Sequence, residues 1–173
     1  MLYIMRHGKT DWNEQHKLQG RTDIPLNDDG IKMAEAAALK YKDVHFDICY
    51  CSPLKRAKKT AEILLAGRDI PIISDDRLVE MSFGKYEGVK SSFSTDANKL
   101  KSSDSQVNIL FEAPEKYQAP DDGETFEELF KRTGNFLDEV VMQKLEEGKD
   151  VLIVGHAWCD EFKYCMPHKK YWT

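Results

Sequence analysis

The sequence predicts an α/β fold, a three-layer α/β/α sandwich with a mostly parallel central sheet. Three observations lead to this prediction. Short runs rich in β-branched or aromatic residues recur along the chain, segments with helical periodicity lie between them, and one run is apolar at every position. Continuous apolar runs are typical of strands covered on both faces. The 173 residues fit one domain (1–173) with a full core, since single domains usually span roughly 100–200 residues.

Three short apolar runs are the predicted central strands: Leu2–Met5, Phe46–Cys51 and Val151–Val154. Each is rich in β-branched or aromatic residues, as expected for buried strands. A fourth candidate, Ile70–Ser74, is weaker because it contains Pro71, and proline suits only the start of a strand or an edge strand.

Helix signals lie between these runs. Asn27 predicts the N-cap of a helix over roughly 28–41, which carries an apolar stripe along one face. Ser52 followed by Pro53 predicts the start of a second helix, with a cap residue and then proline at the first helical position. The stripe of this second helix consists of Leu54, Ala57, Ala61 and Leu64 or Leu65.

A capping box predicts a third helix, with Thr125 as the cap and Glu128 three residues further on. Apolar periodicity continues as far as Leu145, and Gly148 is a usual residue for the end of a helix. A last short helix is expected before Pro167. Its apolar positions are Trp158, Phe162 and Cys165.

The segment 89–120 differs from the rest of the chain. It is rich in Ser, Lys and Asp and has no long apolar periodicity. We therefore expect an irregular, lid-like excursion from the core in this segment.

Charge and hydropathy exclude several functional classes. The net charge of −5 argues against non-specific nucleic-acid binding, which needs a basic face. No apolar run approaches the roughly 20 residues that a membrane-spanning helix requires. The start of the chain has neither the basic flank nor the cleavage site of a secretory signal, so we expect none.

The four cysteines follow C-x-C and C-x5-C spacings, at 49 and 51 and at 159 and 165, and match no common zinc or redox pattern. Cys49 and Cys51 lie in an apolar run, where a buried thiol acts as a small hydrophobe. We expect a reducing compartment, and therefore a cytoplasmic protein.

Candidate functional residues follow the three predicted central strands. Arg6 and His7 come after the first strand, Arg56 follows the second, and His156 follows the third. Ligands of parallel sheets bind beyond the carboxyl ends of the strands, so we expect these four side chains to lie together. Guanidinium groups bind phosphate or carboxylate oxygens, which predicts an anionic ligand.

Each of these residues also has a plainer interpretation. A single histidine at a strand end is more often structural, and a single arginine is more often a surface charge, but their joint placement favours a site. His16, His45 and His168 lack such a context and are expected on the surface. No H-x3-H or H-E-x-x-H pair is present and paired arginines would repel a cation, so we expect no metal and no cofactor.

The order of the motifs resembles that of a known family. The motifs are RHGKT at 6–10 with WN at 12–13, LQGRTD at 18–23, SPL at 52–54, Glu80 with EG at 87–88, GET at 123–125, and GH at 155–156. An RHG triplet alone is weak, whereas the ordered set is specific. It resembles the histidine phosphatase superfamily, also called the phosphoglycerate mutase-like family, which implies a phosphoglycerate mutase-like α/β fold. Only 17 residues follow His156, a short C-terminal end for this family.

The resemblance implies a role for each candidate residue. His7 would be the nucleophile and form a phosphohistidine, while Arg6, Arg56 and His156 would surround the phosphoryl group. Glu80 would protonate the leaving alkoxide and then activate water. Neutral donors would come from Asn13, Gln19 and Gly20.

The identity of the acid is less clear than that of the nucleophile. Glu87 and Glu124 are nearby alternatives to Glu80, although Glu87 also fits a surface carboxylate beside a turn glycine. Arginines would lower the pKa of Glu80 and burial would raise it, and the sequence leaves both open.

The superfamily contains both phosphatases and mutases. The motif over 80–88 resembles the phosphatase branch, which includes α-ribazole phosphatase and broad-specificity phosphatases. We therefore expect hydrolysis of a small phosphomonoester, with a small phosphorylated metabolite as the partner and a homodimer left open. The alternatives are phosphoryl transfer of the phosphoglycerate mutase type and a non-catalytic relative that binds phosphorylated ligands.

Overall fold

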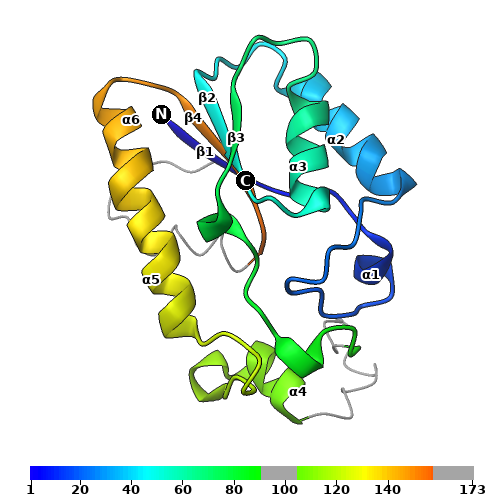
Figure 1. The fold of residues 1–173 in the computed structure, drawn as a ribbon. Helices are drawn as coiled ribbons and strands as arrows, with labels where there is room; N and C mark the ends of the chain where they lie inside the picture. Colours follow the sequence, from blue (N-terminus) through cyan, green and yellow to red (C-terminus); the bar gives the residue numbers. More distant parts are fainter. Residues whose placement is uncertain (91–104, 158–173) are drawn as a thin grey trace.

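A four-stranded parallel sheet forms the centre of the molecule (Figure 1). The computed structural model describes residues 1–90 and 105–157. The strands are β1 (Leu2–Arg6), β2 (Ile48–Cys51), β3 (Ile72–Ser74) and β4 (Val151–Gly155), in the order β1-β4-β2-β3. All four predicted strands are therefore confirmed, and the weakest of them lies at an edge, as its proline requires.

Two helical layers cover the two faces of the sheet, which confirms the three-layer sandwich (Figure 1). The layer of α2 (Asp28–Lys40) and α3 (Lys55–Leu64) covers one face, and α5 (Phe126–Phe136) with α6 (Met142–Glu146) covers the other. Every residue of β4 is buried, because its side chains alternate between the two layers.

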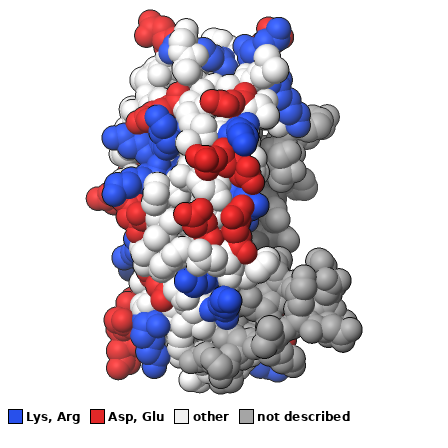
Figure 2. Space-filling model, turned by 90° about the vertical axis from the view of Figure 1, so that its right-hand side faces the viewer, with Lys and Arg blue, Asp and Glu red and all other residues white. Residues whose placement is uncertain are grey.

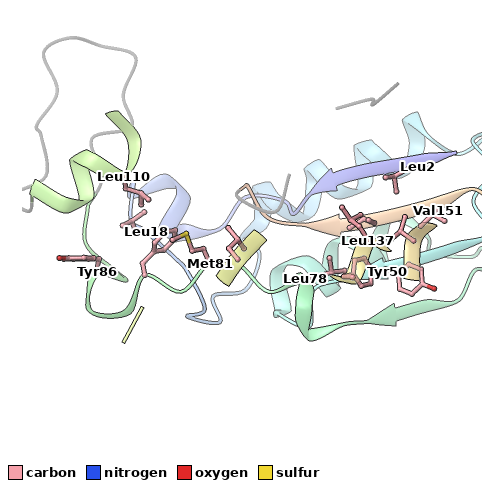
Figure 3. Packing of buried hydrophobic residues seen from close by; sticks show 14 of the residues in the cluster. Leu2, Leu18, Tyr50, Leu78, Met81, Tyr86, Leu110, Leu137 and Val151 are labelled. Carbon is pink, nitrogen blue, oxygen red and sulfur yellow. The ribbon is translucent and has the colours of Figure 1, made fainter. Parts of the chain in front are cut away.

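The two faces of β4 belong to two separate hydrophobic clusters. Val151 and Ile153 pack in the cluster on the α5 side, whereas Leu152 and Val154 pack in the cluster on the α3 side. The α5-side cluster continues past the end of the sheet to Leu110, so one core supports both the sheet and the segment beyond it (Figure 3).

Two of the predicted helix starts are confirmed by their hydrogen bonds. The Asn27 side chain accepts the backbone N–H of Gly30 at 2.9 Å at the start of α2. Thr125 and Glu128 form the reciprocal capping box at the start of α5. The predicted periodicity continues through a π-helical turn at Leu137–Val141 into α6.

The predicted start of the second helix is wrong. The helix α3 begins at Lys55 rather than at Pro53, and its first N–H donates to the Asp23 carboxylate at 2.7 Å. The hydroxyl oxygen of Ser52 accepts the backbone N–H of Leu54 at 3.3 Å and also lies 2.8 Å from Nε2 of His156. Ser52 thus contacts the residue that follows β4, and the carboxylate of Asp23 accepts the first N–H of α3.

The described part of the segment 89–120 includes regular structure that the sequence did not predict. It contains the helix α4 (Ser105–Glu112), in which Val107 and Leu110 are completely buried. These residues join the cluster that also contains Leu18 and Met81 (Figure 3). A short helix α1 (Asp11–Glu14) is a further addition, and the helix predicted before Pro167 falls outside the described residues.

Lys and Arg are intermixed with Asp and Glu on the face shown in Figure 2, the side of the molecule on which α2 and α3 lie. Exposed ion pairs on these helices include Lys59 with Glu62 and Lys32 with Asp29. Along 1–90 and 105–157, no helix has the length and hydropathy that a membrane span requires.

Candidate active site

The carboxyl ends of the strands bring the predicted residues together. Arg6 ends β1 opposite Gly155 of β4, and the backbone N–H of His7 donates to the Gly155 carbonyl at 3.1 Å. This register places the rings of His7 and His156 with their centroids 5.0 Å apart. A cavity of about 520 Å³ opens here. The predicted site residues that line it are Arg6, His7, Asn13, Gln19, Gly20, Arg56 and Glu80.

The backbone after β1 is held tightly against two helices. The N–H of Gly8 donates to the hydroxyl of Thr60 at 3.0 Å, and that hydroxyl donates to the Arg56 carbonyl within α3. A Cβ on Gly8 would lie 2.5 Å from the carbonyl oxygen of Gly30, so only glycine fits this approach. These contacts fix the His7 backbone relative to α2 and α3.

One hydrogen bond sets the tautomer of His7. Its Nδ1 lies 2.6 Å from the carbonyl oxygen of Gly8, which can only accept, so Nδ1 carries the proton and Nε2 keeps its lone pair. Burial, followed by the positive charge of Arg56, lowers the pKa of His7 from its ordinary value of 6.5 to about 3. The ring is therefore neutral at physiological pH, the state that a nucleophilic imidazole requires.

This low pKa predicts an unusual titration. A lowered pKa means that the neutral ring persists as the pH falls, so we expect His7 to remain neutral at pH 5, where an ordinary histidine is mostly protonated. Nitrogen-15 NMR of the imidazoles should show a protonated Nδ1 and a bare Nε2 for His7 at that pH. A titration of this ring centred near pH 6.5 would contradict the assignment.

His156 is completely buried beside His7. Its Nε2 forms a hydrogen bond with the Ser52 hydroxyl at 2.8 Å. Its Nδ1 is buried and has no hydrogen-bond partner among the residues that the structure describes. Burial and then the charge of Arg56 lower the pKa of His156. His156 lies directly behind His7 and, unlike the other predicted site residues, is not among the described residues that line the cavity.

The two arginines of the site differ in environment. Arg6 is exposed, whereas Arg56 is only 1% exposed and lies on the first turn of α3. The Arg56 guanidinium donates to the carbonyls of Thr22 at 2.9 Å and Gly20 at 2.7 Å. These bonds fix the orientation of the guanidinium, and its remaining N–H groups can serve an anion in the cavity.

Glu80 is buried, and its carboxylate accepts the backbone N–H of Met81 at 2.9 Å. Burial raises the pKa of Glu80, and it outweighs the opposing influence of that hydrogen bond and of Arg56 and Arg6. The sequence leaves open whether burial or the nearby arginines dominate the pKa of Glu80, and in the structure burial dominates. A raised pKa suits a carboxyl group that must donate a proton.

The two alternative glutamates are already engaged elsewhere. Both carboxylate oxygens of Glu124 accept from Arg132, at 2.6 and 2.8 Å, and Arg132 also donates to the backbone carbonyl of Glu80 at 3.2 Å. Glu87 accepts backbone N–H groups from the loop after Gln19. Of the three glutamates, Glu80 is the one that lines the cavity, and Glu87, which the sequence suggests as a surface carboxylate, is half-buried.

The neutral donors are oriented by Thr10. The backbone N–H of Thr10 donates to Oδ1 of Asn13 at 3.0 Å and its hydroxyl donates to Oε1 of Gln19 at 2.9 Å, so the oxygen end of each amide is engaged. The amide nitrogen of each is the end left to bind an anion in the cavity. No sequence signal beyond the position of Thr10 indicates this orientation.

An apolar wall completes the cavity. It consists of Leu18, Phe83, Leu110, Phe111 and Pro114. Three of these residues, Leu110, Phe111 and Pro114, come from the segment 89–120. His16 and Lys17 also line the cavity, so His16 is exposed as predicted but lies at the site rather than apart from it.

Among the described residues, one group has metal-ligand spacing, formed by His45, Asp47 and Asp150. It lies at the opposite, amino ends of β2 and β4. Cationic partners already bind its carboxylates: Lys149 reaches Asp47 at 3.3 Å, and the terminal amine of Met1 reaches Asp150 at 2.5 Å. The chemistry of the cavity itself is that of an anion site.

Comparisons with known proteins agree with this geometry. The profile of the histidine phosphatase superfamily (branch 1) matches residues 2–160. The uncharacterized phosphatase PhoE of Bacillus subtilis is 48% identical over 86 residues, which are 50% of this chain and 45% of that protein. The matched part thus spans less than half the length of that relative.

Two further relatives cover most of the chain. The 2,3-bisphosphoglycerate-dependent phosphoglycerate mutase of Cytophaga hutchinsonii is 32% identical over 161 residues, which are 91% of this chain and 72% of that enzyme. The solved structure of Bacillus stearothermophilus YhfR matches with a TM-score of 0.78 at 31% identity, covering 96% of this chain and 80% of that one. On motifs, fold and site together, the chain belongs to branch 1 of the histidine phosphatase superfamily.

Proposed function

We propose that this chain hydrolyses a small phosphomonoester through a phosphohistidine on His7, with Glu80 as the general acid and then the general base. The observation that carries the proposal is the bond from Nδ1 of His7 to the Gly8 carbonyl, which leaves Nε2 as the nucleophile. Arg6 and Arg56 line the same cavity and supply the positive charge that a phosphoryl group requires.

In the first step, the Nε2 lone pair of His7 attacks phosphorus and the bond to the ester oxygen breaks. Glu80 gives its proton to the departing alkoxide, which leaves as an alcohol. The positive charges of Arg6 and Arg56 stabilise the phosphoryl oxygens as this bond loosens. The products of the step are the alcohol, the phosphohistidine and an ionised Glu80.

In the second step, ionised Glu80 takes a proton from a water molecule as the water oxygen attacks phosphorus. The P–N bond to His7 breaks, inorganic phosphate forms, and Glu80 is protonated again. The raised pKa of Glu80 supports both roles, since a group that titrates closer to neutrality can give and take a proton at the same site.

The cavity supports a substrate with one phosphate and a compact remainder. The charged groups lie at the strand ends, and the rest of the lining includes apolar side chains such as Phe83 and Phe111. A volume of about 520 Å³ suits a small molecule. We propose a cytoplasmic location for the reaction, in which the buried free thiols of Cys49 and Cys51 stay reduced.

Hydrolysis is favoured over mutase transfer by two observations. The motif over 80–88 resembles the phosphatase branch, and the relative with 48% identity bears the name of a phosphatase. A mutase must return the phosphoryl group to its substrate, whereas a phosphatase passes it to water.

The test is a panel of phosphomonoesters with measurement of released phosphate. We expect hydrolysis of p-nitrophenyl phosphate, and with 3-phosphoglycerate we expect free phosphate and no 2-phosphoglycerate. Formation of 2-phosphoglycerate without net phosphate release would favour a mutase. Absence of turnover across the panel, with phosphate binding retained, would favour a binding module.

A further inference from the structure

Glu87 has no role in the proposed reaction, yet its carboxylate accepts four hydrogen bonds. Its Oε1 accepts the backbone N–H of Arg21 at 2.9 Å and that of Phe83 at 3.2 Å. Its Oε2 accepts the backbone N–H of Thr22 at 2.8 Å and also the Thr22 hydroxyl. This carboxylate therefore holds the loop over 20–22 against the segment that follows Glu80.

The same loop holds Arg56 on its other side. The carbonyl of Gly20 accepts from Nη2 of Arg56, and that carbonyl and the N–H of Arg21 belong to one peptide group. A trans peptide points its N–H and its C=O in opposite directions. Glu87 and Arg56 thus bind the two ends of one peptide dipole, and each charge strengthens the bond made by the other.

A second branch reinforces this connection. The backbone N–H and hydroxyl of Thr22 bind Glu87, while the carbonyl of Thr22 accepts from Nη1 of Arg56 at 2.9 Å. The loop also fits closely over Glu87, because a Cβ on Gly20 would lie 2.0 Å from Oε1 of Glu87. Gly20 has φ +53°, a conformation that glycine adopts without strain.

We propose that Glu87 is a positioning residue for Arg56, acting through the 20–22 loop to set the orientation of the guanidinium that binds the phosphoryl group. This inference rests on the proposed function only in taking the ligand to be a phosphoryl group. The negative charge of Glu87 polarises the loop carbonyls toward Arg56, and the two bonds to those carbonyls fix the plane of the guanidinium. Glu87 itself is not among the residues that line the cavity.

The test measures inorganic phosphate binding by calorimetry in Glu87→Gln, which keeps the shape of the side chain and removes its charge and one acceptor. We expect the Kd for phosphate to rise about tenfold, as suits the loss of one charge-assisted hydrogen bond. Glu147→Gln is the matched control, because Glu147 is exposed and its carboxylate pairs with Lys144 at 2.9 Å. It should leave the Kd unchanged.

A double-mutant cycle separates positioning from a merely structural role. In an Arg56→Ala background, Glu87→Gln should change the phosphate Kd by less than about twofold, because the residue through which it acts is gone. An equal, additive loss in both backgrounds would overturn the inference. So would an unchanged Kd in a folded Glu87→Gln protein.

Thr22→Ala provides a milder variant should Glu87→Gln not fold. It removes the hydroxyl that donates to Glu87 and keeps the backbone bonds, so a rise in Kd of about two- to threefold is expected only when Arg56 is present. A wild-type protein that binds phosphate without hydrolysing esters would contradict the proposed function while the cycle still tests Glu87. A wild-type protein that binds no phosphate would overturn the inference.

Discussion

Replacement of His7 by alanine is expected to lower kcat/KM for p-nitrophenyl phosphate by on the order of 10⁴-fold or more. The loss should be this large because the variant lacks the His7 imidazole, whose Nε2 lone pair is left free by the bond from Nδ1 to the Gly8 carbonyl. Steady-state kinetics with product absorbance measures it directly.

Phosphate binding provides the control for this variant. Arg56 and His156 do not depend on the His7 side chain for their hydrogen bonds, so His7→Ala should still bind inorganic phosphate. Retained binding with lost turnover separates a missing nucleophile from a collapsed site. Activity within tenfold of the wild type would show that another group attacks phosphorus.

Glu80→Gln is expected to have an effect that depends on the leaving group. The amide has no proton to give to the departing oxygen, so alkyl phosphates should be phosphorylated on the enzyme about 10²–10⁴-fold more slowly. p-Nitrophenolate leaves readily without a proton, and its burst of release should slow by less than about tenfold. Rapid-mixing kinetics with substrates of graded leaving-group pKa provides the measurement.

The burst phase is the proper comparison because Glu80 also acts in the second step. Turnover of p-nitrophenyl phosphate by Glu80→Gln should become limited by hydrolysis of the phosphohistidine. Glu62→Gln is a suitable control, since Glu62 is exposed on α3 and pairs with Lys59. Equal losses for good and poor leaving groups would contradict the role of Glu80 as general acid.

The positions of the main site residues could be predicted because parallel strands share one direction. Arg6, His7 and His156 each follow an apolar run, so the register of β1 and β4 alone brings them together. Arg56 could be placed because it begins the helix after β2. Local capping rules were also sufficient for Asn27, whose partner lies three residues away.

The failures concern residues whose partners are distant in sequence. Ser52 was assigned to a helix cap because Pro53 follows it, yet its hydroxyl binds His156, 104 residues further on. Glu87 was interpreted as a surface carboxylate because its partners Arg21 and Thr22 lie 66 and 65 residues before it. Such contacts depend on the tertiary fold, and no local pattern encodes them.

The helix α4 was missed for a different reason. Among the described side chains of α4, only Val107 and Leu110 are completely buried, so its apolar face is too short to give a clear period beside a polar tract. Its burial arises from packing against Leu18 and Met81, which lie far away in sequence. The polar composition of the surrounding segment therefore gave no indication of α4, which contributes Leu110 and Phe111 to the cavity lining.

The most direct test of the account is detection of the covalent intermediate. Glu80→Gln should accumulate it, so this variant is mixed with p-nitrophenyl phosphate, quenched with alkali and digested for mass spectrometry. We predict a peptide carrying one added phosphoryl group on His7, and its absence from a His7→Ala, Glu80→Gln double variant. Phosphorylation of another residue, or a burst of p-nitrophenol with His7 unmodified, would contradict the account.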